Sequence, residues 1–132
     1  VRTLIEFGDF MTAFDSMILC KFGRSIFTID VMWEFYNAVT GANMSQKEFR
    51  RALERIRVLI QMINVNRGLT KEHETLPERF TKEKIEDPDG NLYGIDASEI
   101  DYMVSTYYQL RGFDKNGKPT REKINELGLD TL

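Results

Sequence analysis

The sequence predicts an all-α fold, an irregular bundle of about five helices with one extended excursion near residues 82–95. Apolar residues recur at helical spacing along most of the chain, capping residues precede these stretches, and glycines follow them. No two stretches form a convincing strand pair. At 132 residues the chain is long enough for one domain with a core and too short for two ordinary ones. We therefore expect a single helical domain over residues 1–132.

The first two helices follow from apolar spacing. The stretch from residue 3 to residue 22 contains Leu4, Phe7, Met11, Phe14 and Ile18 at helical spacing. We expect a helix to about residue 14 and then an apolar loop from Asp15 to Cys20, because Gly23 soon interrupts the pattern. The next helix has Asp30 as its expected N-cap and Gly41 as its C-terminal stop. Its apolar set is Val31, Phe35 and Val39.

The third helix carries the strongest signal. Ser45 and Glu48 form a capping box, S-x-x-E, at its start. Behind the box, apolar residues alternate by four and three: Phe49, Leu53, Ile56, Ile60 and Ile63. Leu59 and Met62 widen this stripe, so we expect the helix to be covered on more than one side.

The rest of the chain alternates irregular and helical segments. "NVNRGLTKEHETLPERF" has no period, and "EDPDGNLYGID" carries Asp-Pro and Asp-Gly turn signals typical of a surface excursion. Helicity resumes around Ser98 and ends at Gly112. Its apolar set is Ile100, Met103, Val104, Tyr107, Tyr108 and Leu110. After a turn at "FDKNGKPT", Thr120 is the expected N-cap of a short helix that ends at Gly128.

Composition bounds the function. The chain is 42% apolar and 30% charged, as globular proteins are, and its uncharged apolar runs are too short to span a membrane. A net charge of −3 and a pI of about 5.3 argue against nucleic acid as the main partner. The single cysteine excludes an internal disulfide framework and suits a reducing, cytoplasmic location. No signal peptide is recognisable at the start, and the chain opens within an apolar pattern, as expected for a piece of a longer protein.

Two loop features have a chemical and a structural interpretation. His73 is the only histidine and could act as an acid or base, but no serine or cysteine nucleophile lies near it, which favours a solvated loop histidine. "DKNGK" is weakly similar to a calcium loop, yet most ligands and the acidic twelfth residue are missing. A plain turn is the better interpretation.

Two helical features also favour structure over chemistry. The run "RRALERIR" places Arg50, Arg51, Arg55 and Arg57 around one helix. Such charges usually form a solvated face, here with Glu48 and Glu54 as local partners, and only occasionally a phosphate site. Tyr107 and Tyr108, together with Met103, could belong to a cofactor site, but core packing is favoured.

Cys20 leaves three interpretations open: a small core residue, a reactive thiol, or one ligand of a metal site. A thiolate can bind iron or zinc, but an iron–sulfur cluster requires about four ligands and this chain supplies one cysteine. On spacing alone, a buried structural cysteine is favoured.

Three segments read in order change this balance: "DSMILCKF", "NVNRGLTKEHETLPERF" and "TYYQLRGFDKNGKPTREKINELGL". The last contains a tyrosine pair, an Arg-Gly-aromatic-Asp turn, a Gly-x-Pro-Thr loop and a helix ending in Glu-Leu-Gly-Leu. These residues are Tyr107, Tyr108, Arg111, Gly112, Phe113, Asp114, Gly117, Pro119, Thr120, Glu126, Leu127, Gly128 and Leu129. The chain resembles the carboxy-terminal end of the tungsten-dependent aldehyde:ferredoxin oxidoreductases over nearly its whole length, residues 82–95 excepted.

The resemblance implies three site residues, because Asp15 to Cys20 matches the second pterin-contacting D-x-x-G-L-[CD] motif of that family. Asp15 is then expected to hydrogen-bond a pterin, Leu19 to line the site through its backbone, and Cys20 to be the fourth thiolate of a 4Fe-4S cluster. The other three thiolates are expected in an upstream domain. Ile18 stands where the motif has glycine. That change raises the question of whether a positive φ is kept there.

The function implied is two-electron oxidation of an aldehyde to a carboxylic acid by a tungsten, or molybdenum, bis-pterin cofactor, with electrons passed to ferredoxin. The expected partners are ferredoxin and the upstream domains of the same enzyme, and a homo-oligomer is compatible with the resemblance. We expect the isolated chain to be inactive and to bind neither tungsten nor iron. One alternative is a non-catalytic helical binding module derived from that fold, which Ile18 and His73 support. The other is an unrelated helical bundle with a buried Cys20.

Overall fold

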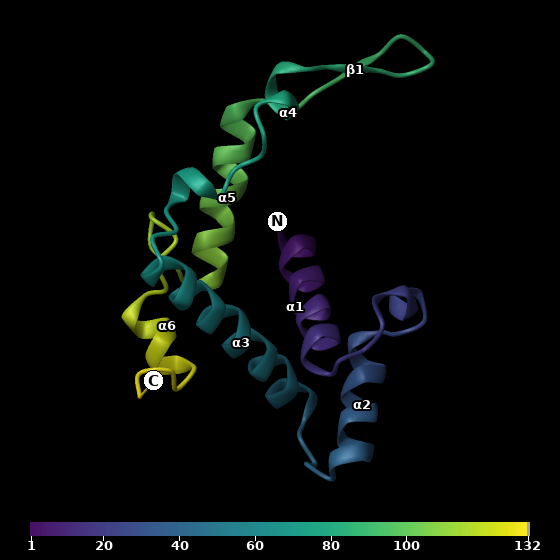
Figure 1. Cartoon of the computed structure of the whole chain (residues 1–132), viewed down its shortest axis with the longest axis vertical. Coiled ribbons are helices and arrows are strands. Elements are labelled where there is room, and N and C mark those ends of the chain that lie inside the picture. Colours follow the sequence, from purple (N-terminus) through teal and green to yellow (C-terminus); the bar gives the residue numbers. More distant parts are fainter. Residues whose placement is uncertain (132) are drawn as a thin grey trace.

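The computed structural model describes residues 1–131, which form six α-helices, two short 3-10 helices and one two-stranded sheet (Figure 1). The α-helices are α1 (Arg2–Ser16), α2 (Ile29–Thr40), α3 (Gln46–Asn66), α4 (Arg79–Lys82), α5 (Ala97–Arg111) and α6 (Arg121–Glu126). The 3-10 helices are η1 (Lys21–Ser25) and η2 (Lys71–His73), and the strands are β1 (Ile85–Glu86) and β2 (Leu92–Tyr93). The prediction of an irregular all-α fold is confirmed, and the one-turn α4 is the helix that the periodicity missed.

Helix α3 takes part in two separate apolar clusters. Its first half supplies Phe49 and Leu53 to a cluster that also contains Ala13 and Phe14 of α1 and Met32 of α2. Its second half supplies Val58 to another cluster, formed with the end of α5 and the C-terminal segment: Tyr108, Phe113, Leu127 and Leu129. Leu59 and Met62 pack against the second cluster. The expectation that α3 is covered on more than one side is therefore confirmed.

The predicted helix ends are largely confirmed, because capping depends on neighbouring residues alone. At α3, the Ser45 hydroxyl accepts from the Glu48 N–H at 3.2 Å, and the Glu48 carboxylate accepts from the Ser45 N–H at 2.7 Å. Gly41 and Gly112 end α2 and α5 with positive φ values of 68° and 71°. Thr120 caps α6, as expected.

Helix α2 departs from prediction in its start and in its rotation. Its N-cap is Thr28, whose hydroxyl accepts from the Val31 N–H at 3.2 Å, so Asp30 lies in the first turn instead. The predicted apolar set, Val31, Phe35 and Val39, is exposed. Met32 is buried in its place, with Trp33 and Tyr36 packed against the first cluster.

A distant contact explains this rotation of α2. The Trp33 indole N–H donates to the Met44 carbonyl at 2.6 Å, and Asn37 brackets the same residue by accepting from its N–H and donating to its carbonyl. These bonds turn Trp33 and Asn37 toward the segment that follows the helix. Apolar spacing contains no information about that loop.

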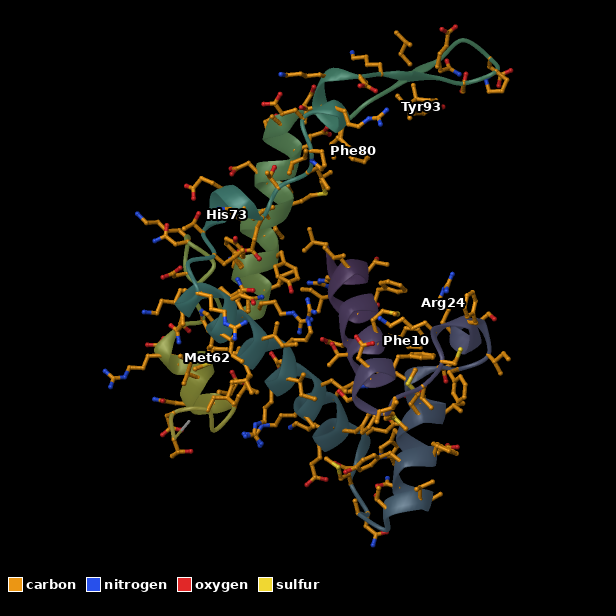
Figure 2. The ribbon with its side chains drawn as sticks, viewed as in Figure 1. Phe10, Arg24, Met62, His73, Phe80 and Tyr93 are labelled. Atoms are coloured by element: carbon orange, nitrogen blue, oxygen red, sulfur yellow. The ribbon has the colours of Figure 1, made fainter. Side chains whose placement is uncertain are left out.

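The excursion near residues 82–95 is extended, as predicted, but it contains a strand pair that the sequence did not predict. Ile85 pairs with Tyr93 and Glu86 with Leu92 in an antiparallel hairpin. Two residues per strand are too few for alternation to be recognised. The turn is held by Asp87, whose carboxylate accepts from the Asn91 N–H at 2.8 Å. Figure 2 shows the hairpin projecting beyond the helices, with Tyr93 on it and Phe80 near its base.

Helices α1 and α5 are joined by a buried ion pair. Arg111, the last residue of α5, is 3% exposed and donates to both carboxylate oxygens of Asp9 in α1, at 2.6 and 3.3 Å. It also donates to the Ile5 carbonyl at 3.3 Å. Burial alone would lower the pKa of Arg111, but the hydrogen bonds and charge of Asp9 outweigh burial and raise it.

Within residues 1–131, no helix is long and apolar enough to cross a membrane.

Candidate functional site

The segment expected to contact a cofactor lies at the end of α1 and in the turn that follows it. The helix continues to Ser16, so Asp15 belongs to its last turn and not to a loop as predicted. The Leu19 N–H donates to the Phe14 carbonyl at 2.9 Å, and the Ile18 N–H donates to the Asp15 carbonyl at 3.3 Å. This pair of bonds is a Schellman motif, which satisfies the free carbonyls at a helix end. The motif explains why the helix continues to Ser16, beyond the end predicted at about residue 14.

Ile18 adopts the backbone conformation that usually requires glycine. Its φ is +56°, in the left-handed region, and its side chain is 91% exposed. This conformation brings Cβ too close to the carbonyl oxygen, at a cost of about 1–2 kcal/mol. The motif glycine is therefore missing from the sequence, but the positive φ at its position is kept.

Replacing Ile18 with glycine is expected to stabilise the chain by about 1 kcal/mol, because it removes the left-handed strain and little buried surface. Urea denaturation followed by circular dichroism measures the change. Ile26 is the matched control, since it is 79% exposed but has a negative φ of −99°. Ile26→Gly is expected to lower stability. A loss of stability for both variants would contradict the assignment of strain to Ile18.

Cys20 is exposed, so the packing interpretation favoured on spacing alone is wrong. Leu19 supplies the inward side chain of this turn and packs against the first cluster. Cys20 follows in extended conformation as the residue that precedes η1, and its carbonyl accepts from the Gly23 N–H at 2.9 Å. Its thiol is consequently accessible to groups outside this chain.

Asp15 and Leu19 flank the same turn. The Asp15 carboxylate is exposed and lies 2.9 Å from the Lys21 Nζ, so an ion pair joins the residues on either side of the turn. The Leu19 N–H already donates to the Phe14 carbonyl. The Leu19 carbonyl is therefore the backbone group of this residue that could face a cofactor. A carboxylate, a carbonyl and a thiol thus follow one another around a single turn.

The residues fit a cofactor that is held mainly by other parts of a longer protein. Within residues 1–131, no three His, Cys, Asp or Glu side chains are grouped to hold a metal ion. One exposed thiol can still supply a single ligand to an iron–sulfur cluster, which is bound by four cysteines. One exposed carboxylate can accept hydrogen bonds from ring N–H groups of a pterin.

The other sequence candidates are structural, as predicted. His73 is exposed, and its Nδ1 accepts from the Thr70 N–H at 3.1 Å, which closes the short helix η2 (Figure 2). The Asp114 carboxylate accepts from the N–H groups of Asn116 and Lys118 at 2.8 and 3.0 Å, so "DKNGK" is a turn.

The arginine run has partners other than those predicted. Arg50, Arg51 and Arg55 are exposed, but Arg57 is not part of this solvated face. Arg50 pairs with Asp30 at 3.1 Å, whereas Glu54 pairs with Lys123 at 3.0 Å. The predicted local pairing failed because the opposing elements α2 and α6 offer closer partners.

The tyrosine pair packs in the second cluster, as predicted, but Tyr108 also has a polar role that was missed. Its hydroxyl donates to Glu74, and the Gln61 side chain donates to the same carboxylate and to the Gly117 carbonyl at 3.0 Å. Burial, the hydrogen bond and the charge of Glu74 raise the pKa of Tyr108 well above its ordinary value. These residues are far apart in sequence, so no local signal could have predicted the network.

Comparisons with known proteins show the family of this chain. Residues 1–129 match the family model described as aldehyde ferredoxin oxidoreductase, domains 2 and 3. Tungsten-containing aldehyde ferredoxin oxidoreductases from Thermococcus kodakarensis and Pyrococcus furiosus are 33% and 32% identical over 130 residues, 98% of this chain. The chain spans about a fifth (21%) of the length of these relatives.

A solved structure is also similar. It is the active site complex BamBC of benzoyl coenzyme A reductase in complex with 1,5-dienoyl-CoA, with a TM-score of 0.63 and 26% identity. The similarity covers 80% of this chain and 14% of that one.

Taken together, the fold and these matches define a helical part of an oxidoreductase family. The chain belongs to the aldehyde ferredoxin oxidoreductase family, and the match lies in domains 2 and 3 of that family. The resemblance stated from the sequence is confirmed.

Proposed function

We propose that the chain is the carboxy-terminal part of a tungsten-pterin enzyme that oxidises aldehydes to carboxylic acids. The observation that carries this proposal is the exposed Cys20 at the end of a turn that keeps a positive φ at Ile18. The family match over residues 1–129 supports it, and the named relatives contain tungsten. Because the chain spans about a fifth of those relatives, the activity belongs to the longer protein.

Three residues have proposed roles toward the cofactors. Cys20 supplies one thiolate to a 4Fe-4S cluster whose other ligands lie elsewhere in the longer protein. Asp15 accepts hydrogen bonds from a pterin, and the Leu19 carbonyl lines the same site. When bound, the tungsten-pterin group and the cluster supply the redox chemistry, and the protein positions and tunes them. The Lys21 Nζ lies 2.9 Å from the Asp15 carboxylate and so orients it beside the turn.

The proposal extends to partners and location. Ferredoxin is the electron acceptor, and the upstream domains of the same enzyme supply the remaining cofactor contacts. An accessible thiol that binds a cluster suits the reducing cytoplasm. The alternative of a non-catalytic module rested on Ile18 and His73, and the retained turn at Ile18 removes part of that support.

Metal analysis of two preparations tests the proposal. The full-length protein that contains this chain is expected to carry tungsten and four irons per chain, in keeping with one 4Fe-4S cluster. The isolated 132-residue chain is expected to carry neither in stoichiometric amount and to lack aldehyde oxidation. Full-length protein without tungsten or iron would favour the binding module, and a complete cluster in the isolated chain would contradict the assignment of the other ligands to upstream domains.

A further inference from the structure

A cavity separate from the Cys20 turn lies between α1, α3 and α5. Its volume is about 460 Å³, which is within the range of small-molecule sites, roughly 300–1,000 Å³. Its walls are mainly apolar, with Leu4 and Phe7 from α1 and Met103, Val104 and Tyr107 from α5. Such a lining accommodates a hydrophobic group of ligand size.

One charged side chain in this cavity has no partner among residues 1–131. Arg57 of α3 lines the cavity, and its Nε is buried without a hydrogen-bond partner in that range, although the residue as a whole is partly exposed. The ion pairs of the same residues do not include Arg57. A buried donor atom is unfavourable unless something accepts from it, so the Nε position calls for an acceptor.

The neighbouring charges make that acceptor an anion. A Cβ placed on Gly8 would lie 3.9 Å from both the Arg57 and Arg111 guanidiniums, so both groups approach α1 at the same point. Asp9 neutralises Arg111 through two hydrogen bonds, which leaves Arg57 without a carboxylate partner among residues 1–131. Glu74 also lines the cavity, but its carboxylate already accepts from Tyr108 and Gln61.

We propose that Arg57 binds the carboxylate of a ligand whose apolar body fills this cavity. A planar guanidinium matches the geometry of a carboxylate, and the apolar walls favour a monocarboxylate with an aromatic or aliphatic body. The carboxylate belongs to a free acid that is small enough to enter the cavity. The inference stands on the cavity and Arg57 and does not depend on the proposed tungsten chemistry.

Calorimetric titration of the full-length protein with benzoate tests this assignment, with benzamide as the uncharged probe of the same shape. Benzoate is expected to bind at least about tenfold more tightly than benzamide, as for a hydrogen bond to a charged group. Arg57→Gln is expected to remove that advantage. The control is Arg55→Gln, because Arg55 is exposed on the same helix and its guanidinium donates to the Gly128 carbonyl at 3.4 Å, outside the cavity.

A crystal structure of the full-length protein shows whether Arg57 is free to bind a ligand. Benzoate binding that depends on Arg57 supports a free acid as the ligand. An Asp or Glu side chain of the protein hydrogen-bonded to the Arg57 Nε overturns the proposal, because the position is then already occupied. Equal binding of benzoate and benzamide, or an Arg57→Gln variant that binds benzoate as the original does, also overturns it. Because metal content and aldehyde oxidation are not read out, failure here is distinct from failure of the proposed function.

Discussion

Asp9→Ala is expected to lower the free energy of unfolding by about 3–5 kcal/mol, the typical cost of removing one partner of a buried ion pair. Arg111 is 3% exposed and has Asp9 as its only acidic partner within residues 1–131. The alanine variant would leave the guanidinium buried with the Ile5 carbonyl as its remaining acceptor in that range. It would also remove the ionic link between α1 and α5. Urea denaturation followed by circular dichroism measures this loss.

Asp30→Ala is the matched control, because Asp30 also pairs with an arginine but lies on the surface. The Asp30 and Arg50 side chains are 57% and 52% exposed. An exposed pair contributes about 0–1 kcal/mol, since water screens it. If Asp9→Ala costs no more than Asp30→Ala, the buried pair does not hold α1 to α5.

Cys20→Ser is expected to abolish the proposed iron–sulfur cluster of the full-length protein and to lower the proposed aldehyde oxidation by at least about 100-fold. Serine keeps the size of the side chain but removes the thiolate. Iron content and visible absorbance report on the cluster, and a separate activity measurement reports on electron transfer. Because the Cys20 side chain is exposed, the substitution is expected to leave folding unchanged.

Ser25→Ala, in the short helix η1 that follows Cys20, serves as the control for Cys20→Ser. Ser25 is exposed, so its replacement should leave iron content and activity as they were. Retention of four irons in Cys20→Ser would remove Cys20 from the proposed ligand set. Loss of iron in both variants would indicate a general disturbance of η1 and would also count against a specific role for Cys20.

The features predictable from the sequence are those determined by neighbouring residues. The Ser45–Glu48 box, the terminal glycines and the Thr120 cap act within a turn of their own helix, so the helix ends could be located. The inward face of α2 could not, because the Met44 carbonyl and N–H that orient it lie beyond the helix. From apolar spacing alone, Val31 and Phe35 were as good candidates for the core as Met32, which is the residue that is buried.

The candidate site also contains features that could be predicted from the sequence and features that depend on the folded structure. The motif residues Asp15 and Cys20 could be named from the sequence through resemblance, but spacing alone placed Cys20 in the core. Its exposure depends on the left-handed turn at Ile18, which isoleucine does not favour and a local pattern does not predict. Arg57 was assigned to a solvated face because the burial of its Nε depends on α1 and α5, which are distant in sequence.

The participation of α3 in both apolar clusters has a mechanical consequence. A straight helix of 21 residues is about 30 Å long and resists bending, so it acts as one side of a frame. α1 packs on its first half, α5 packs on its second half, and the Asp9–Arg111 pair joins those two helices directly. The three helices are therefore joined in pairs, so α1 cannot turn against α5 without breaking the ion pair or the contacts with α3. Cys20 lies just beyond the end of α1, so these joints also restrain the turn that carries its thiol.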